Sequence, residues 1–149
     1  MNKEQKPISI LIIEDELHFA EQIKLMIFRA LDGLNRSVYF HTATSINEAR
    51  AALEKNNLNL ITLDGHLDHE KICTELLPDL EKITSCTILL LTRDDRIINE
   101  ENTGSEFYIS RKIIPQNLRF RKGFGQGDFP GVKDEHYGLL RKLLLEHAL

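Results

Sequence analysis

The chain has 149 residues, of which 42% are hydrophobic and 28% charged, and a net charge of −4 from 19 basic and 23 acidic side chains. This composition is typical of one soluble globular domain, spanning residues 1–149, and it argues against general nucleic-acid binding. No apolar run approaches the ~20 residues that a membrane helix needs, and residues 1–7 are too polar for a signal peptide, so we expect a cytoplasmic protein without a membrane segment.

Short apolar runs alternate with longer amphipathic stretches along the chain. The runs at 8–13 (ISILII), 58–63 (LNLITL) and 87–91 (TILLL) have the length and the apolar character of buried strands. Between them, apolar residues recur at helical spacing. In chain order we expect strand 8–13, helix 17–34, strand 38–41, helix 45–55, strand 58–63, helix 69–83, strand 87–91, helix 95–101, strand 107–111 and helix 133–147.

Five strands that alternate with helices predict a parallel sheet covered on both faces. This is a doubly wound α/β fold of three layers. Before the last helix, glycines at 123, 125, 127 and 131 mark a long loop. We find no internal repeat and no sign of a second domain.

Polar side chains end several of the expected strands. Ligands of parallel α/β sheets bind outside the carboxyl ends of the strands, where these side chains would converge. They are Glu14 and Asp15 after the first strand, Asp64 after the third, Thr92 after the fourth, and Arg111 and Lys112 after the fifth. Singly, each has an ordinary explanation as a helix cap, a turn or a solvated charge, and only their convergence points to a site.

Three converging carboxylates repel one another and favour a cation between them. Mg²⁺ suits carboxylate oxygens, keeps several waters and accepts phosphate oxygens. Asp is an established nucleophile for phosphoryl groups, and a neighbouring Lys or Arg neutralises the charge of the transfer. The residues therefore indicate phosphoryl transfer to Asp64, with Thr92 able to bond a phosphoryl oxygen.

Residues 8–16 (ISILIIEDE) resemble the first strand and the acidic pair of response-regulator receiver domains, the phosphoacceptor domains of two-component systems. The resemblance continues in order through residues 42–53, 60–64, 88–92 and 104–108, so it covers residues 8–112. It implies a CheY-like (flavodoxin-like) fold and a stand-alone response regulator. In that frame, 113–132 is an atypical loop and 133–147 the C-terminal helix.

The resemblance also implies a role for each residue of the site. Asp64 accepts the phosphoryl group from a sensor histidine kinase or a histidine phosphotransfer protein. Mg²⁺ is held by Glu14, Asp15, Asp64 and the backbone carbonyl of His66. The phosphoryl group is contacted by Thr92 and by Lys112, with Arg111 as the alternative cation, and Tyr108 is the aromatic that reorients with it. Such a phosphoprotein is a switch in signal transduction rather than an enzyme, and without a DNA-binding domain it would signal by contact with an unknown downstream protein.

Some residues depart from the pattern of that family. Gly65 and His66 follow the acceptor where apolar residues are commoner, Arg93 replaces the usual small residue, and no proline follows Lys112. These departures motivate an alternative, a degenerate receiver that acts as a phosphorylation-independent interaction module. The Gly- and Phe-rich loop 120–131 is a candidate contact site, unless its phenylalanines fold back onto the domain.

A different class of protein is suggested by residues 64–69 (DGHLDH). This run resembles the HxHxDH motif of metallo-β-lactamase-type hydrolases, with the first His replaced by Asp, and Asp64, His66, Asp68 and His69 are candidate zinc ligands. Against a metal-dependent hydrolase, that fold needs a longer chain and further distant ligands. The simpler explanation places His66 in a surface loop and His69 at the start of a helix.

Overall fold

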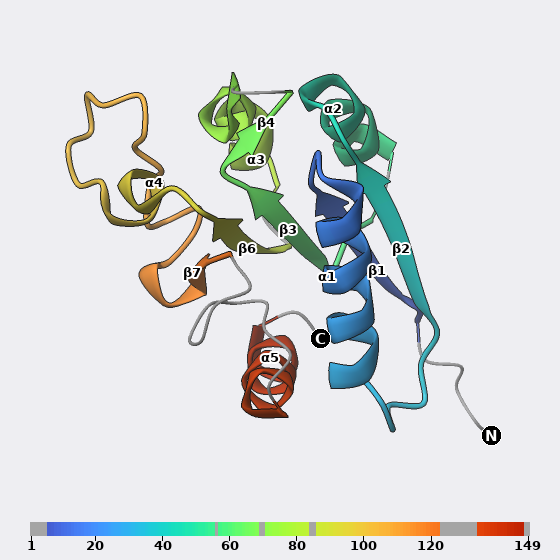
Figure 1. Cartoon of the computed structure of the whole chain (residues 1–149). Helices are drawn as coiled ribbons and strands as arrows, with labels where there is room; N and C mark the ends of the chain where they lie inside the picture. The colour runs from blue at the N-terminus through green and yellow to red at the C-terminus, as the bar shows by residue number, and fades with distance from the viewer. Residues whose placement is uncertain (1–5, 56, 69–70, 84–85, 123–133, 148–149) are drawn as a thin grey trace.

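In the computed structural model, five strands form one sheet with helices on both faces (Figure 1). The structure describes residues 6–55, 57–68, 71–83, 86–122 and 134–147. The strands lie in the order β2-β1-β3-β6-β7, and every neighbouring pair is parallel. Their bounds are β1 Ile8–Ile13, β2 Val38–Ala43, β3 Leu60–Asp64, β6 Thr87–Thr92 and β7 Arg119–Arg121. The predicted α/β fold with a five-stranded parallel sheet is confirmed.

Helices cover the two faces of the sheet through two separate apolar clusters. The helices α1 (Leu17–Ala30) and α5 (Asp134–His147) pack on one face, against the side chains of Ile8, Ile10 and Ile12. The other face is covered by α2 (Ile46–Lys55), the 3-10 helix η1 (Cys73–Leu76), α3 (Leu77–Glu81) and α4 (Asp95–Asn99). Within the described ranges, no helix is long and apolar enough to cross a membrane.

Burial along the strands follows their place in the sheet. All five residues of the central strand β3 are buried, as a continuous apolar run requires in a sheet covered on both faces. The edge strand β2 instead exposes Tyr39, His41 and Thr42.

The segment after β3 differs from the predicted helix 69–83. A two-stranded hairpin, β4 (His66–Leu67) with β5 (Lys71–Ile72), comes first, and only η1 and α3 are helical. Asp68 has a φ of 50°, which no helix accommodates, and its carboxylate accepts a hydrogen bond from the backbone N–H of Ile46 at 3.2 Å. Pro78 lies in the first turn of α3, where proline is well tolerated, rather than inside a longer helix.

The fifth strand also lies elsewhere than predicted. Residues 107–111 belong to a series of turns, and the strand that pairs with β6 is β7, after the 3-10 helix η2 (Gln116–Leu118). Arg119 explains this arrangement, because its buried guanidinium donates hydrogen bonds to backbone carbonyls of the preceding segment. The acceptors are the carbonyls of Ile109 at 2.6 Å, Ile114 at 2.9 Å, Ile97 at 3.3 Å and Ile98 at 3.4 Å.

The C-terminal helix was expected at 133–147 and is described as Asp134–His147. Most of the Gly- and Phe-rich loop, residues 123–131, lies outside the described residues. Of its start, Phe120 is in β7 and packs against both apolar clusters.

Candidate functional site

Four buried polar side chains meet where β1, β3, β6 and β7 end. Glu14 follows β1, Asp64 ends β3, Thr92 ends β6 and Lys122 follows β7, and each is at most 7% exposed. Because the strands are parallel and adjacent, their carboxyl ends share one edge of the sheet. The structure thus brings the predicted Glu14, Asp64 and Thr92 to one place.

The carboxyl groups form a group that is able to hold a metal ion. One oxygen each from Glu14, Asp15 and Asp64 lies within 4.8 Å of the others. No other group of three such residues was found in the part of the chain that the structure describes. An all-oxygen donor set of this kind fits a hard cation such as Mg²⁺.

Asp64 is held in an environment that disfavours its charge. Burial, and then hydrogen bonding to Glu14 and repulsion by it, raise the pKa of Asp64 to about 9, although the Lys122 ammonium opposes the shift. A carboxyl group that resists ionisation for these reasons is one that a bound cation would convert to the carboxylate.

Lys122 is the cation of the site. Its Nζ lies 2.6 Å from Glu14 Oε1 and 3.2 Å from Asp64 Oδ2, and it sits 4.6 Å above the centre of the Phe19 ring. The backbone N–H of Lys122 donates to the carbonyl of Thr92 at 2.8 Å, which fixes the residue against the end of β6.

The two cations expected from the sequence are not brought to this edge. Lys112 is exposed and lines a surface hollow with Cys86 and Ile88, at the opposite end of β6 from Thr92. Arg111 donates to the carbonyl of Glu100 and to Gln116. The sequence did carry a signal for Lys122. The only basic cluster of the chain is Arg119, Arg121 and Lys122, and it coincides with β7, the strand that the sequence analysis did not predict.

Gly65 allows β6 to approach the end of β3 closely. A Cβ atom at this position would lie 2.1 Å from Thr92 Oγ1 and 2.9 Å from Cδ1 of Ile97. Thr92 is fully buried, and its Oγ1 accepts a hydrogen bond from the N–H of Asp94 at 3.1 Å. The departure from the family pattern at Gly65 is therefore what makes room for Thr92.

The loop after β6 is tied to the segments that follow β1 and β3. Arg93 lies 3.8 Å from the Glu16 carboxylate and stacks over Phe19 at 4.7 Å, on the side of β1. Asp94 pairs with His66 Nε2 at 2.7 Å, on the side of β3. Hydrogen bonds from Arg96 and then from His66 hold the pKa of the Asp94 carboxyl well below its usual range. Neither Arg93 nor Asp94 was expected to make these contacts.

The remaining predicted residues are placed as follows. His66 begins β4, and its backbone carbonyl as a metal ligand stays a prediction. Tyr108 is half-buried among the turns before β7, where Arg111 lies 5.9 Å from its ring centre, and its part in a switch also stays a prediction.

The run 64–69 does not gather its side chains into a zinc site within the described residues. Asp68 caps α2 and His66 pairs with Asp94, so the two point to different partners. His69 lies outside the described residues. The hydrolase alternative therefore gains no support from this geometry.

Comparison with solved structures identifies proteins that have a similar fold. No protein-family model matches the sequence, and no curated protein matches it significantly. Solved structures do match. The PhyR response-regulator REC domain of Erythrobacter litoralis is 15% identical with a TM-score of 0.62, over 95% of this chain and 90% of that one. The CheY-like receiver domain protein of Methanospirillum hungatei JF-1 is 18% identical with a TM-score of 0.58, over 95% and 94%.

A third similar structure is the anti-anti-sigma factor PhyR of Bartonella quintana. It is 18% identical with a TM-score of 0.61, and the match covers 96% of this chain and 51% of that one. At these identities the likeness concerns the fold. The chain has the fold of response-regulator receiver domains.

Proposed function

We propose that this chain is a phosphoacceptor switch of the response-regulator type, in which Asp64 takes up the phosphoryl group. One observation carries the proposal. Asp64 lies at the carboxyl end of the central strand, buried between two further carboxyl groups and the Lys122 ammonium, in a receiver fold. Carboxylates and a lysine in this arrangement can bind a metal, attack phosphorus and neutralise the charge that develops.

The donor set fits Mg²⁺. Glu14, Asp15 and Asp64 would hold the ion, with the backbone carbonyl of His66 as the proposed fourth protein ligand. When bound, Mg²⁺ supplies positive charge that offsets the charge of the phosphoryl oxygens.

The protein's own groups would then carry the transfer. Asp64 in its ionised form attacks phosphorus, the new O–P bond forms, and the bond from phosphorus to the donor breaks, with its electron pair leaving on the donor. Lys122, whose Nζ is 3.2 Å from Asp64 Oδ2, would shift its contact to a phosphoryl oxygen. The hydroxyl of Thr92, whose oxygen accepts from the backbone N–H of Asp94, would donate its own hydrogen to another phosphoryl oxygen.

The donor would be a sensor histidine kinase or a histidine phosphotransfer protein, and the output a contact with a downstream protein. Among the similar structures, the Bartonella protein is named an anti-anti-sigma factor. Phosphorylation adds a charge of about −1.5 to −2, by analogy with other phospho-residues, and would act on the strand ends at Thr92 and Lys122.

A second candidate function is a degenerate receiver that works as an interaction module without phosphorylation. The contacts of Arg93 with Glu16 and of Asp94 with His66 favour it, because they tie three loops together around the acceptor. A site closed in this way would hold one conformation.

Intact mass spectrometry after incubation with acetyl phosphate separates the two. We expect the native chain to gain the mass of one phosphoryl group only when Mg²⁺ is present, and Asp64→Asn to gain none. Asp95→Asn, which changes an exposed carboxylate in α4, is the matched control and is expected to be labelled like the native chain. If the native chain gains no phosphoryl mass, either with acetyl phosphate or with phosphotransfer proteins as donors, the switch is ruled out and the interaction module remains.

A further inference from the structure

The outward face of α1 is apolar. Leu17, Leu25 and Phe28 are 64%, 59% and 63% exposed. At helical spacing these three side chains form one stripe, in which Glu21 also lies. The opposite face of the helix carries the residues that pack on the sheet: Phe19, Ala20, Ile23, Met26, Ile27 and Ala30. The helix thus has two apolar faces, and the stripe is the one that the described chain leaves exposed.

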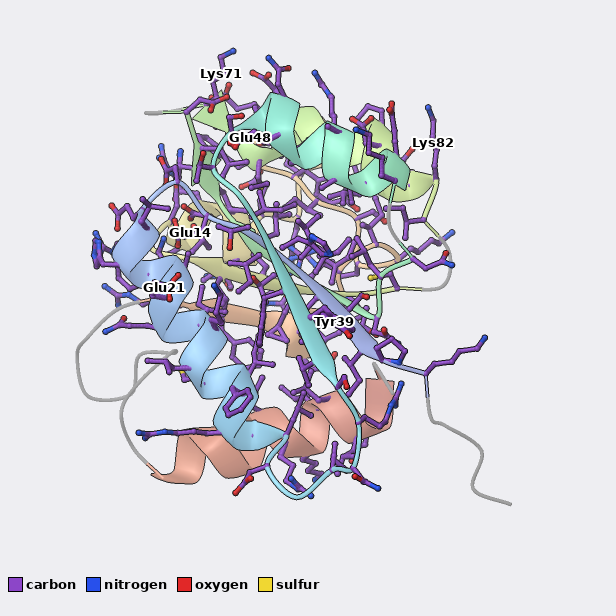
Figure 2. All side chains as sticks on the ribbon, turned by 90° about the vertical axis from the view of Figure 1, so that its right-hand side faces the viewer. Glu14, Glu21, Tyr39, Glu48, Lys71 and Lys82 are labelled. Carbon is purple, nitrogen blue, oxygen red and sulfur yellow. The ribbon has the colours of Figure 1, made fainter. Side chains whose placement is uncertain are left out.

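The neighbouring helix α5 also carries exposed leucines. Leu139 and Leu145 of α5 are 42% and 46% exposed. The two helices pack side by side, and Arg141 of α5 donates to the carbonyls of Ala30 and Asp32 at the end of α1. Figure 2 shows α5 crossing below the C-terminal end of α1, with Glu21 labelled on α1. Of the six large apolar side chains exposed among the described residues, all but Tyr39 belong to these two helices. Such a concentration marks an interaction surface.

The charges on α1 indicate which partner would bind this surface. Glu21 lies within the stripe, and Lys24 lies beside it with its Nζ 3.3 Å from Glu21 Oε1. If a second α1 packs antiparallel across a two-fold axis near residues 22 and 23, Leu17 lies opposite Phe28 of the second copy. Glu21 then lies opposite Lys24 of the second copy, and the same pair recurs on the other side of the axis. A parallel arrangement would set Glu21 against Glu21, so the stripe complements itself in the antiparallel direction.

We propose that the outward face of α1 is the interface of a symmetric dimer, in which the two α1 helices pack antiparallel. The partner is a second copy of this chain. The proposal is independent of phosphorylation at Asp64, because the stripe lies on the face of α1 turned away from the sheet. One helix face makes a small interface, so we expect reversible association with a dissociation constant on the order of micromolar or weaker.

Sedimentation of the full chain over a range of concentrations tests the interface. We expect the mass to rise towards that of a dimer with concentration, and Phe28→Glu to weaken association at least ~10-fold, because it buries a charge opposite Leu17. Tyr39→Glu is the matched control. Tyr39 is also exposed, but it alternates with Val38 and Phe40, which face the α1 layer, and so it lies on the other side of the sheet. The control is expected to associate like the native chain.

Charge reversal tests the antiparallel pairing itself. Glu21→Lys and Lys24→Glu each set like charges opposite one another and should each weaken self-association. An equimolar mixture of the two variants should associate again, because every crossing then pairs a lysine with a glutamate, and the double variant should associate like the native chain. Thermal melts of each variant control for folding. The proposal is overturned by a chain that stays monomeric at every concentration, by association that Phe28→Glu leaves unchanged, or by a mixture that fails to recover.

Discussion

At the scale of single residues, Lys122 has the largest consequence for the site. Its ammonium contacts both Glu14 and Asp64 and packs on the ring of Phe19. The Lys122 residue is only 4% exposed, whereas its neighbour in sequence, Arg121, is exposed to solvent. A buried lysine is retained only where its charge is compensated, and here its ammonium lies 2.6 Å from an oxygen of Glu14 and 3.2 Å from one of Asp64. Lys112, in contrast, is exposed and has no carboxylate of this site near it.

Removing each lysine should therefore have different effects on labelling. We expect Lys122→Met to slow the gain of a phosphoryl group from acetyl phosphate by about 10- to 100-fold, the equivalent of about 1.5–3 kcal/mol for one lost charge-assisted contact. The initial rate of the mass gain at saturating Mg²⁺ measures the effect.

Lys112→Met is the control for that experiment, since it removes the same charge at the far end of β6. It should be labelled at the native rate. If the Lys112 variant is slow and the Lys122 variant is not, the cation of the site has been misidentified.

At the scale of elements, the segment between α4 and β7 is held by one side chain. Arg119 starts β7 and donates to four carbonyls contributed by α4 and by the turns at 109–114. Burial lowers the pKa of its guanidinium to about 10, so it keeps its proton at neutral pH. The acceptors lie between 5 and 22 positions before Arg119, and residues 107–111 (FYISR) do not form the strand that their pattern predicts.

Removing these contacts should destabilise the fold. We expect Arg119→Met to lower the free energy of unfolding by about 2–4 kcal/mol, because several carbonyls lose their donor while buried. Urea unfolding measures the change. Arg121→Met, at the exposed end of the same strand, is expected to change it by about 0.5 kcal/mol or less. Equal effects of the two substitutions would mean that the carbonyls find other donors.

At the scale of the whole molecule, the site at the sheet edge couples stability to pH. The folded protein holds a proton on Asp64 up to about pH 9, whereas in the unfolded chain the pKa of this group returns to the ordinary value of 3.8. The folded state thus binds one more proton than the unfolded state between those two values. Because the pKa is raised on folding, the stabilisation is complete below the unfolded value and is lost as pH rises through the folded one.

We expect the free energy of unfolding of the metal-free chain to fall as the pH rises between about pH 4 and about pH 9, because the unfolded chain loses this proton at a lower pH than the folded one. Asp64→Asn should remove that slope, since the amide does not titrate. Urea unfolding in the presence of a chelator, at several pH values, measures both.

Mg²⁺ should act in the opposite direction, because it binds the ionised carboxylate. Its stabilising effect is expected to grow with pH up to about pH 9. A stabilisation that is the same at every pH, or absent, would contradict a metal site that includes Asp64.

Much of this molecule was determined by local sequence. The apolar runs that became β1, β3 and β6 predict buried parallel strands wherever they occur, because a strand covered on both faces needs apolar residues at every position. Since the carboxyl ends of such strands share an edge, the sequence also placed Glu14, Asp64 and Thr92 together. The amphipathic pattern of residues 17–34 likewise predicted α1.

Only the tertiary structure decided which strand completes the sheet and which lysine meets Asp64. FYISR has the pattern of a strand, but the carbonyl of Ile109 is bonded by Arg119, a contact that no local pattern encodes. The pairing of Arg119 with Leu90 and of Arg121 with Thr92 then sets Lys122, rather than Lys112, at the end of the sheet. The same holds for the paired strands β4 and β5, beside which Asp68 caps α2, a helix that begins 22 residues earlier in the chain. Local preference fixes where a segment is extended or helical, whereas tertiary hydrogen bonds and charge pairs fix its register, and the register decides which side chains meet at the edge of the sheet.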